Sequence, residues 1–136
     1  MRNFKFRGKD CTGEWWYGNL EIRRRITDEK TYESIRISGI VNDNITSMID
    51  AKTVGQFTGL HDVNGNDIYE GDILQYILSC DDEFINAKVK FSVENGAWIL
   101  VNDDDHISEY FEYESGKNSE IIGNIHDNPE LLKTEI

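Results

Sequence analysis

The sequence predicts an all-β protein, and three observations support that fold class. From residue 85 to residue 93 apolar and polar residues alternate strictly, as in a strand with one buried and one wet face. Asn64-Gly65 and Asn95-Gly96 are dipeptides that two-residue hairpin turns accept most readily. Eleven Gly, one Pro and 11% aromatic residues suit many turns between short strands. We expect two units, an N-terminal β-meander or barrel-like unit over residues 1–59 and a β-barrel over residues 60–136.

In the N-terminal unit, three strands are expected to form an antiparallel meander. They are residues 4–7, 14–22 and 32–41. Arg23, Arg24 and Arg25 follow the second strand and lead into a polar loop that runs to Lys30. Residues 45–51 are predicted to form either a helical turn or an irregular link.

In the C-terminal unit, the strands are predicted from the turns that separate them. They are residues 68–69, 73–78, 85–93, 97–101 and 121–125, with 107–113 as either a strand or one helical turn, and a strand at residues 54–57 precedes them at the end of the N-terminal unit. Gly71 interrupts an apolar run and allows the backbone to bend there. Residues 97–101 are apolar throughout, which indicates burial on both faces. Asn128 is expected to cap a short C-terminal helical turn that begins at Pro129 and ends at Leu132.

Short stretches of the two halves resemble each other. TVGQF at residues 53–57 has the pattern of IIGNI at residues 121–125, and the central glycines lie 68 residues apart. Residues 17–20 similarly resemble residues 70–73. These matches suggest the hypothesis of two related β-units in tandem. The alternative is that similar turns recur in any all-β chain.

Charge and cysteine content limit the classes of function. The formal net charge of −12 opposes direct nucleic-acid binding, because Lys and Arg contacts with phosphate supply most of that affinity, and it favours partners with basic faces. Cys11 and Cys80 lack the spacing of a zinc site or a disulfide framework, so both are expected to be free thiols. With no secretory signal and no apolar run of membrane-spanning length, we expect a soluble, cytoplasmic protein that does not bind membranes.

A candidate interaction surface lies in the N-terminal unit. It consists of Trp15, Tyr17, Arg23, Arg24 and Arg25. In a strand, Trp15 and Tyr17 project away from Trp16, so they form an exposed aromatic pair if Trp16 lies in the core. The alternative is that both faces are covered in a small two-layer protein. The arginine triplet either forms a solvated turn or pairs with acidic loops of another copy and so specifies assembly.

No catalytic, cofactor or metal site is predicted. The three histidines lie in or beside turns without ligand spacing, and exposed loop positions explain them (His61, His106 and His126). Residues 62–67 superficially resemble a calcium-binding loop, but the glycine comes two positions early and Ile73 stands where the bidentate Glu is needed. A hairpin turn is therefore the better interpretation of this segment.

Two acidic runs, residues 81–83 and 103–105, are interpreted as solvated loops. Cation binding and imitation of DNA phosphates are the alternatives for them. The sequence contains no phosphate-binding loop, nucleophile elbow or zinc-protease motif.

Several motifs are similar, in the same order, to those of the YopX family of phage and prophage proteins. They are FKFRGKD and WYGNL, then TVGQFTGL, the D-x-N-G sequence, IYEGDIL, and finally IIGNIHDNPELL. The match covers most of the chain. It implies a β-rich phage protein whose C-terminal part is an SH3-like barrel, and the strand start EGDIL at residues 70–74 suits such a barrel. The resemblance implies no particular enzymatic activity and no cofactor.

The leading hypothesis is a non-enzymatic interaction or assembly module that self-associates as a homo-oligomer. It would act as a phage accessory factor and bind a host or phage protein. One alternative is an acidic decoy that imitates DNA and occupies a basic host protein. Another is an enzyme with an unrecognised site, which requires a deep pocket and a group with a shifted pKa. The preference for a binding module rests on the candidate aromatic surface, on the absence of catalytic motifs and, by analogy at the level of the fold, on the barrel class.

Overall fold

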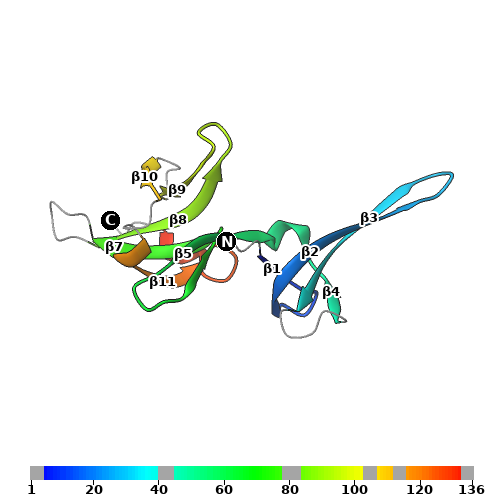
Figure 1. Ribbon diagram of the computed structural model, residues 1–136, viewed down its shortest axis with the longest axis horizontal. Coiled ribbons are helices and arrows are strands. Elements are labelled where there is room, and N and C mark those ends of the chain that lie inside the picture. Colours follow the sequence, from blue (N-terminus) through cyan, green and yellow to red (C-terminus); the bar gives the residue numbers. More distant parts are fainter. Residues whose placement is uncertain (1–4, 40–44, 78–83, 103–106, 112–115, 133–136) are drawn as a thin grey trace. The chain divides into compact units, whose positions relative to one another are not determined.

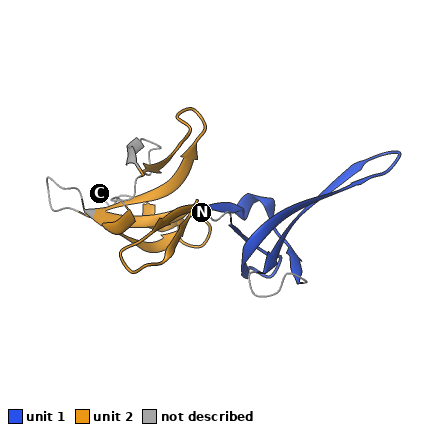
Figure 2. Ribbon diagram, viewed as in Figure 1, with its two compact units in different colours: residues 1–57 blue, residues 58–136 orange. Residues whose placement is uncertain are grey.

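The computed structural model describes residues 5–39, 45–77, 84–102, 107–111 and 116–132, without the side chains of residues 77 and 107–110. Strands dominate these residues and form two antiparallel sheets, which confirms the all-β prediction (Figure 1). The chain divides into two compact units, residues 1–57 and 58–136 (Figure 2). This division falls two residues before the expected boundary at residue 59.

The N-terminal unit is an antiparallel meander closed by a fifth strand. Its elements are β1 (Phe6–Lys9), β2 (Trp15–Ile26), β3 (Thr31–Gly39), β4 (Thr46–Met48), the 3-10 turn η1 (Ala51–Thr53) and the start of β5 (Gly55–His61). The sheet order is β4-β3-β2-β1-β5, and β5 pairs with β1 through Gly55 and Gln56. Residues 40–44, where the third strand was expected to end, lie outside the described residues.

The strand β4 lies where a helical turn or an irregular link was expected. Its three residues pair with residues 36–38 of β3, and the Ile49 N–H then donates to the Ile35 carbonyl at 2.8 Å. The helical turn comes later, at η1, where the Asp50 carboxylate accepts a hydrogen bond from the Lys52 N–H at 3.1 Å. The short sequence of β4 has no strand pattern, so its pairing with β3 stabilises it.

Two glycines allow close packing in this unit. A Cβ at Gly8 would overlap the side chain of Ile49, which is buried with Ile37 in the core. A Cβ at Gly18 would overlap the Ser38 carbonyl oxygen on the neighbouring strand. Gly18 also has a φ of 154°, which side-chain-bearing residues rarely adopt.

β2 and β3 extend beyond the strands beside them. β1 pairs with β2 only from Trp15 to Gly18, and β4 reaches β3 only as far as Ile35. Residues 22–26 pair with residues 31–35 in a long two-stranded hairpin that is plain in Figure 1, and among the described residues no third strand flanks it beyond Ile35. We call residues 22–35 the β2–β3 arm. The prediction that the second strand ends at residue 22 and that the arginine triplet lies in a loop was wrong, because cross-strand pairing with β3 continues β2 to Ile26.

The C-terminal unit contains the second sheet. Its elements are β6 (Asp67–Tyr69), β7 (Asp72–Ile77), β8 (Phe84–Ser92), β9 (Ala97–Val101), β10 (Ile107–Tyr110), β11 (Ser119–Asn124) and the 3-10 turn η2 (Pro129–Leu132). β6 lies beside β5, and the five other strands have the order β10-β9-β8-β7-β11. The core is formed by Ile68, Leu74, Tyr76, Ala87, Val89, Leu100 and Phe111.

Both hairpin turns are longer than the two-residue turns expected from Asn-Gly. The Asp62 N–H donates to the Asn66 carbonyl at 3.0 Å, which leaves three residues in the first loop. β8 and β9 pair last at Ser92 and Ala97, which leaves four residues in the second. In each loop a side-chain oxygen at the strand end, from Asp62 or Ser92, accepts backbone hydrogen bonds, and this stabilises the wider turn.

The C-terminal helical turn lies where it was predicted, at η2. Asn128, the expected N-cap, uses its side chain differently, because its Oδ1 accepts from the Asn124 N–H at 3.4 Å. Asn86 of β8 donates from Nδ2 to the Leu131 carbonyl at 2.9 Å and so attaches η2 to the sheet.

The two units have the same strand order. Each is a four-stranded meander whose first strand also pairs with a fifth, antiparallel strand. The register agrees as well, because Gly55 lies opposite the second residue of β1, and Gly123 lies opposite the second residue of β7. An internal repeat predicts this agreement. The second sequence match is not part of this structural agreement. Residues 17–20 lie in β2, the second strand of the N-terminal meander, whereas residues 70–73 lead into β7, the first strand of the C-terminal meander.

Candidate interaction surface

The aromatic face of β2 is partly covered by cations. The register places Arg7 opposite Tyr17 and Lys9 opposite Trp15. The Arg7 guanidinium carbon lies 4.7 Å from the centre of the Trp15 ring, and the Lys9 ammonium lies 5.4 Å from it. Trp15 is half-buried beneath these groups, whereas Tyr17 is 40% exposed. Tyr17 is therefore the more accessible of the two predicted contact residues.

Trp16 projects to the other face and is held by Asp10. Its indole Nε1–H donates to Asp10 Oδ2 at 3.0 Å, and Asp10 Oδ1 accepts from the Thr12 hydroxyl at 2.6 Å. These two bonds, with backbone donors from Thr12 and Glu14, lower the pKa of Asp10 from 3.8 to about 2. Asp10 thus fixes both the turn after β1 and the Trp16 side chain.

The arginine triplet lies on the β2–β3 arm. Arg23 pairs with Glu21 at 2.7 Å, which lowers the pKa of the Glu21 carboxyl and raises that of the guanidinium. Arg24 pairs across the hairpin with Glu33 at 3.4 Å. Arg25 lies opposite Tyr32 and has no ion pair with any residue that the structure describes. Since strand residues alternate in direction, the triplet divides between the two faces of the arm.

The arm also exposes large apolar side chains. Ile22, Ile26 and Tyr32 are 53%, 78% and 54% exposed. Sequence reasoning missed them because it ended the strand at Ile22. The alternation of Leu20, Ile22 and Ile26 was the available signal that the apolar face continues.

Charge is divided unequally between the two units. Residues 1–57 contain ten Lys and Arg and eight Asp and Glu, whereas residues 58–136 contain four and eighteen. The formal charges are therefore +2 and −14. The acidic character of the chain belongs to the C-terminal unit.

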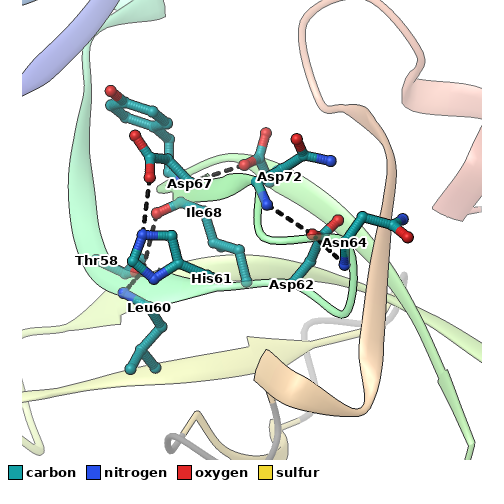
Figure 3. A network of polar contacts seen from close by, with 10 residues as sticks. Thr58, Leu60, His61, Asp62, Asn64, Asp67, Ile68 and Asp72 are labelled. Carbon is teal, nitrogen blue, oxygen red and sulfur yellow. Dashed lines mark hydrogen bonds and ion pairs between the residues drawn. The ribbon is translucent and has the colours of Figure 1, made fainter.

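Asp62 is the centre of a polar network in the C-terminal unit (Figure 3). It is 4% exposed, its Oδ1 accepts from the N–H groups of Asn64 and Asn66 at 2.9 Å, and its Oδ2 accepts from the Ile121 N–H at 3.1 Å. Burial alone would raise the pKa of Asp62, but these donors lower it below 3.8. The segment compared with a calcium loop is a hairpin turn whose first carboxylate accepts backbone hydrogen bonds.

The neighbouring carboxylates also have structural partners. Asp72, 2% exposed, accepts from the Tyr69 N–H at 2.8 Å and closes the turn between β6 and β7. His61 lies 2.9 Å from Asp67 across the hairpin, near its exposed end (Figure 3). His61 is therefore a residue of the hairpin turn that pairs with Asp67, and His106 lies outside the described residues.

A depression of about 330 Å³ lies along the β8–β9 hairpin. Its lining includes Lys90, Phe91, Val93, Glu94, Ile99 and Val101. The described residues contain no group of three or more His, Cys, Asp and Glu that could hold a metal ion. Cys11 is an exposed free thiol, whereas Cys80 and both acidic runs lie outside the described residues. The described part of the chain includes no helix with the length and apolar character of a membrane span.

The comparisons with known proteins identify the family. The architecture is that of an all-β protein with two sheet-forming units, and the family model for YopX proteins matches residues 5–133. The chain therefore belongs to the YopX family. It is similar in structure to protein EF1440 from Enterococcus faecalis, with a TM-score of 0.57 and 22% identity, covering 98% of this chain and 100% of that one. This likeness shows the fold. No curated protein matches the chain.

Proposed function

We propose that this YopX protein is a non-enzymatic interaction module that self-associates and serves as a phage or prophage accessory factor in the bacterial cytoplasm. The β2–β3 arm carries the proposal. An isolated two-stranded hairpin is only marginally stable in water, and this one exposes Ile22, Ile26 and Tyr32. Ile22 and Ile26 share one face of the arm, and a protein partner that covers them would stabilise it, since burial of apolar area favours association.

The C-terminal unit supports the proposal in a different way. Its polar side chains Asp62 and Asp72 accept hydrogen bonds from the backbone and so stabilise the scaffold. In its sheet, β7 to β10 form a four-stranded meander, and the last strand, β11, pairs with the first, β7. This arrangement supports the proposal that the unit is an SH3-like barrel. Small barrels of this kind commonly serve as binding modules, which is an argument by analogy.

Light scattering on the purified protein tests the self-association. We expect a mass that is a multiple of the 15.7 kDa chain and that persists in high salt, because apolar contacts are not screened. A Tyr17→Ala variant, measured beside the unmodified chain, tests whether the aromatic face takes part, because Tyr17 is more exposed than the half-buried Trp15. A monomer at every concentration and salt would refute self-association.

A second candidate function is favoured by the charge of the C-terminal unit. A formal charge of −14 on residues 58–136 suits an acidic decoy for a basic DNA-binding protein. Competition tests this candidate: the protein would displace duplex DNA from a basic nucleoid protein at low salt, and high salt would abolish the effect. Failure to displace DNA at low salt would reject it.

A further inference from the structure

Resting on the proposed self-association, we propose that two copies associate face to face through the apolar side of the β2–β3 arm, with Arg24 of each copy opposite Glu33 of the other. The two arms would run parallel about a two-fold axis that lies along them. The contact is isologous, so each copy contributes the same residues.

The apolar side of the arm continues the core side of the sheet. Cross-strand register pairs Leu20 with Ile37 and Ile22 with Ile35, and directly paired residues project to the same face. Ile37 is fully buried, Ile35 is half-buried and Ile22 is 53% exposed, so coverage decreases along the arm. Ile26, farther out, is 78% exposed. The isoleucines of this face therefore lose their cover where the neighbouring strands end.

Three rows of paired residues form this face. They are Ile22 with Ile35, Arg24 with Glu33, and Ile26 with Thr31. The middle row has an ion pair with side-chain exposures of 67% and 53%, so both groups are accessible to another molecule. One row therefore presents a positive group on one strand and a negative group on the other.

This pattern is complementary to itself in one orientation. Rotation by half a turn about the long axis of the arm keeps each row in place and exchanges the two strands. Arg24 then lies opposite Glu33 of the second copy, and Ile22 lies opposite Ile35 of the second copy. Rotation about an axis across the arm would instead place Arg24 opposite Arg24, and like charges would repel. Sheets that pack face to face keep their strands nearly aligned, as this arrangement requires.

The charges of the molecule favour a second copy over other partners for this face. Residues 21–36 contain five Lys and Arg and four Asp and Glu, so the surroundings of the arm are close to neutral. Nucleic acid or an acidic protein would select a surface of one sign. Two C-terminal units of −14 repel each other, whereas two arms can approach with little repulsion.

Charge-exchange variants test the arrangement. Arg24→Glu gives a copy with two carboxylates in the middle row, and Glu33→Arg gives a copy with two guanidinium groups. Each variant alone should dimerise at least about tenfold more weakly, since every contact in the row becomes repulsive. An equimolar mixture should recover the dimer, because the two variants are complementary to each other. An ion pair used only within one chain gives no such recovery.

Two further variants provide a second test of the contact and a control. All the substituted positions are exposed, so the fold should persist in each variant, and far-UV circular dichroism can verify this. Ile26→Glu should also weaken the dimer by at least about tenfold, since it introduces a carboxylate on the apolar face. Tyr32→Thr alters a side chain of similar exposure to Ile22 on the opposite face and should leave the dimer unchanged.

The outcomes separate this inference from the function on which it rests. A monomeric unmodified protein would refute self-association itself. An oligomer that persists in both charge variants, or whose variants fail to recover on mixing, would overturn the arm contact and leave self-association standing.

Discussion

Asp62 allows a quantitative test of how the C-terminal unit is stabilised. Asp62→Asn keeps the size of the side chain and one acceptor oxygen, which can still bind the N–H groups of Asn64 and Asn66. The new amide group would then face the Ile121 N–H, donor against donor. A hydrogen bond to a charged group contributes about 1.5–3 kcal/mol, so we expect a loss of about 2 kcal/mol in the free energy of unfolding. Asp62→Ala should lower the free energy of unfolding by about 3 kcal/mol, because it removes the acceptor of all three N–H groups and solvent can replace only part of these contacts.

Urea unfolding measured by circular dichroism and by tryptophan fluorescence gives the comparison, and the two probes show whether one transition describes the change. Amide hydrogen exchange at Ile121 should accelerate in the Asp62→Asn variant. Asp67→Asn is the matched control, since its pair with His61 is exposed and should contribute less than about 1 kcal/mol. A loss below about 0.5 kcal/mol for Asp62→Asn, with unchanged exchange at Ile121, would refute the reasoning.

The remaining predictions concern the N-terminal unit. Gly18→Ala should destabilise it by at least about 2 kcal/mol, since the added Cβ overlaps the Ser38 carbonyl and the backbone there has positive φ; an unchanged urea midpoint would contradict this. Asp10 has a folded pKa of about 2 against 3.8, so its stabilisation is complete above pH 3.8 and is lost as pH falls toward 2. Asp10→Asn should therefore lower the free energy of unfolding at pH 7 and reduce its dependence on pH between pH 4 and 2, as measured by urea unfolding with tryptophan fluorescence. The same pH dependence in the variant and the unmodified chain would argue against this role of Asp10.

Much of the fold could be predicted because local patterns specify it. The alternation in residues 85–93 predicted β8 to within one residue at each end, and the break at Gly71 falls between β6 and β7. β4 could not be predicted, because three polar or weakly apolar residues become a strand only through pairing with β3. Local sequence also cannot show the role of Asp62, since one of its donors, Ile121, lies 59 residues away.

The candidate surface could be predicted only in part. The positions of Trp15 and Tyr17 on one strand followed from period-two alternation, but the cations that cover Trp15 come from β1 through cross-strand register. The arginine triplet was assigned to a loop because three charged residues in sequence give no apolar alternation. Their strand conformation comes from pairing with β3 over its full length.

The return of the fifth strand to the first has a consequence for how the chain folds during synthesis. A distance of 48 residues along the chain separates Arg7 from its partner Gly55, and 50 residues separate Ile73 from Gly123. Neither sheet can close until the ribosome has released nearly the whole of its unit, and such long-range closure is slow. β5 emerges well before β11, and both carry glycine followed by an amide residue. The delay lets the first sheet close with its own last strand, before an equivalent strand exists that could take its place.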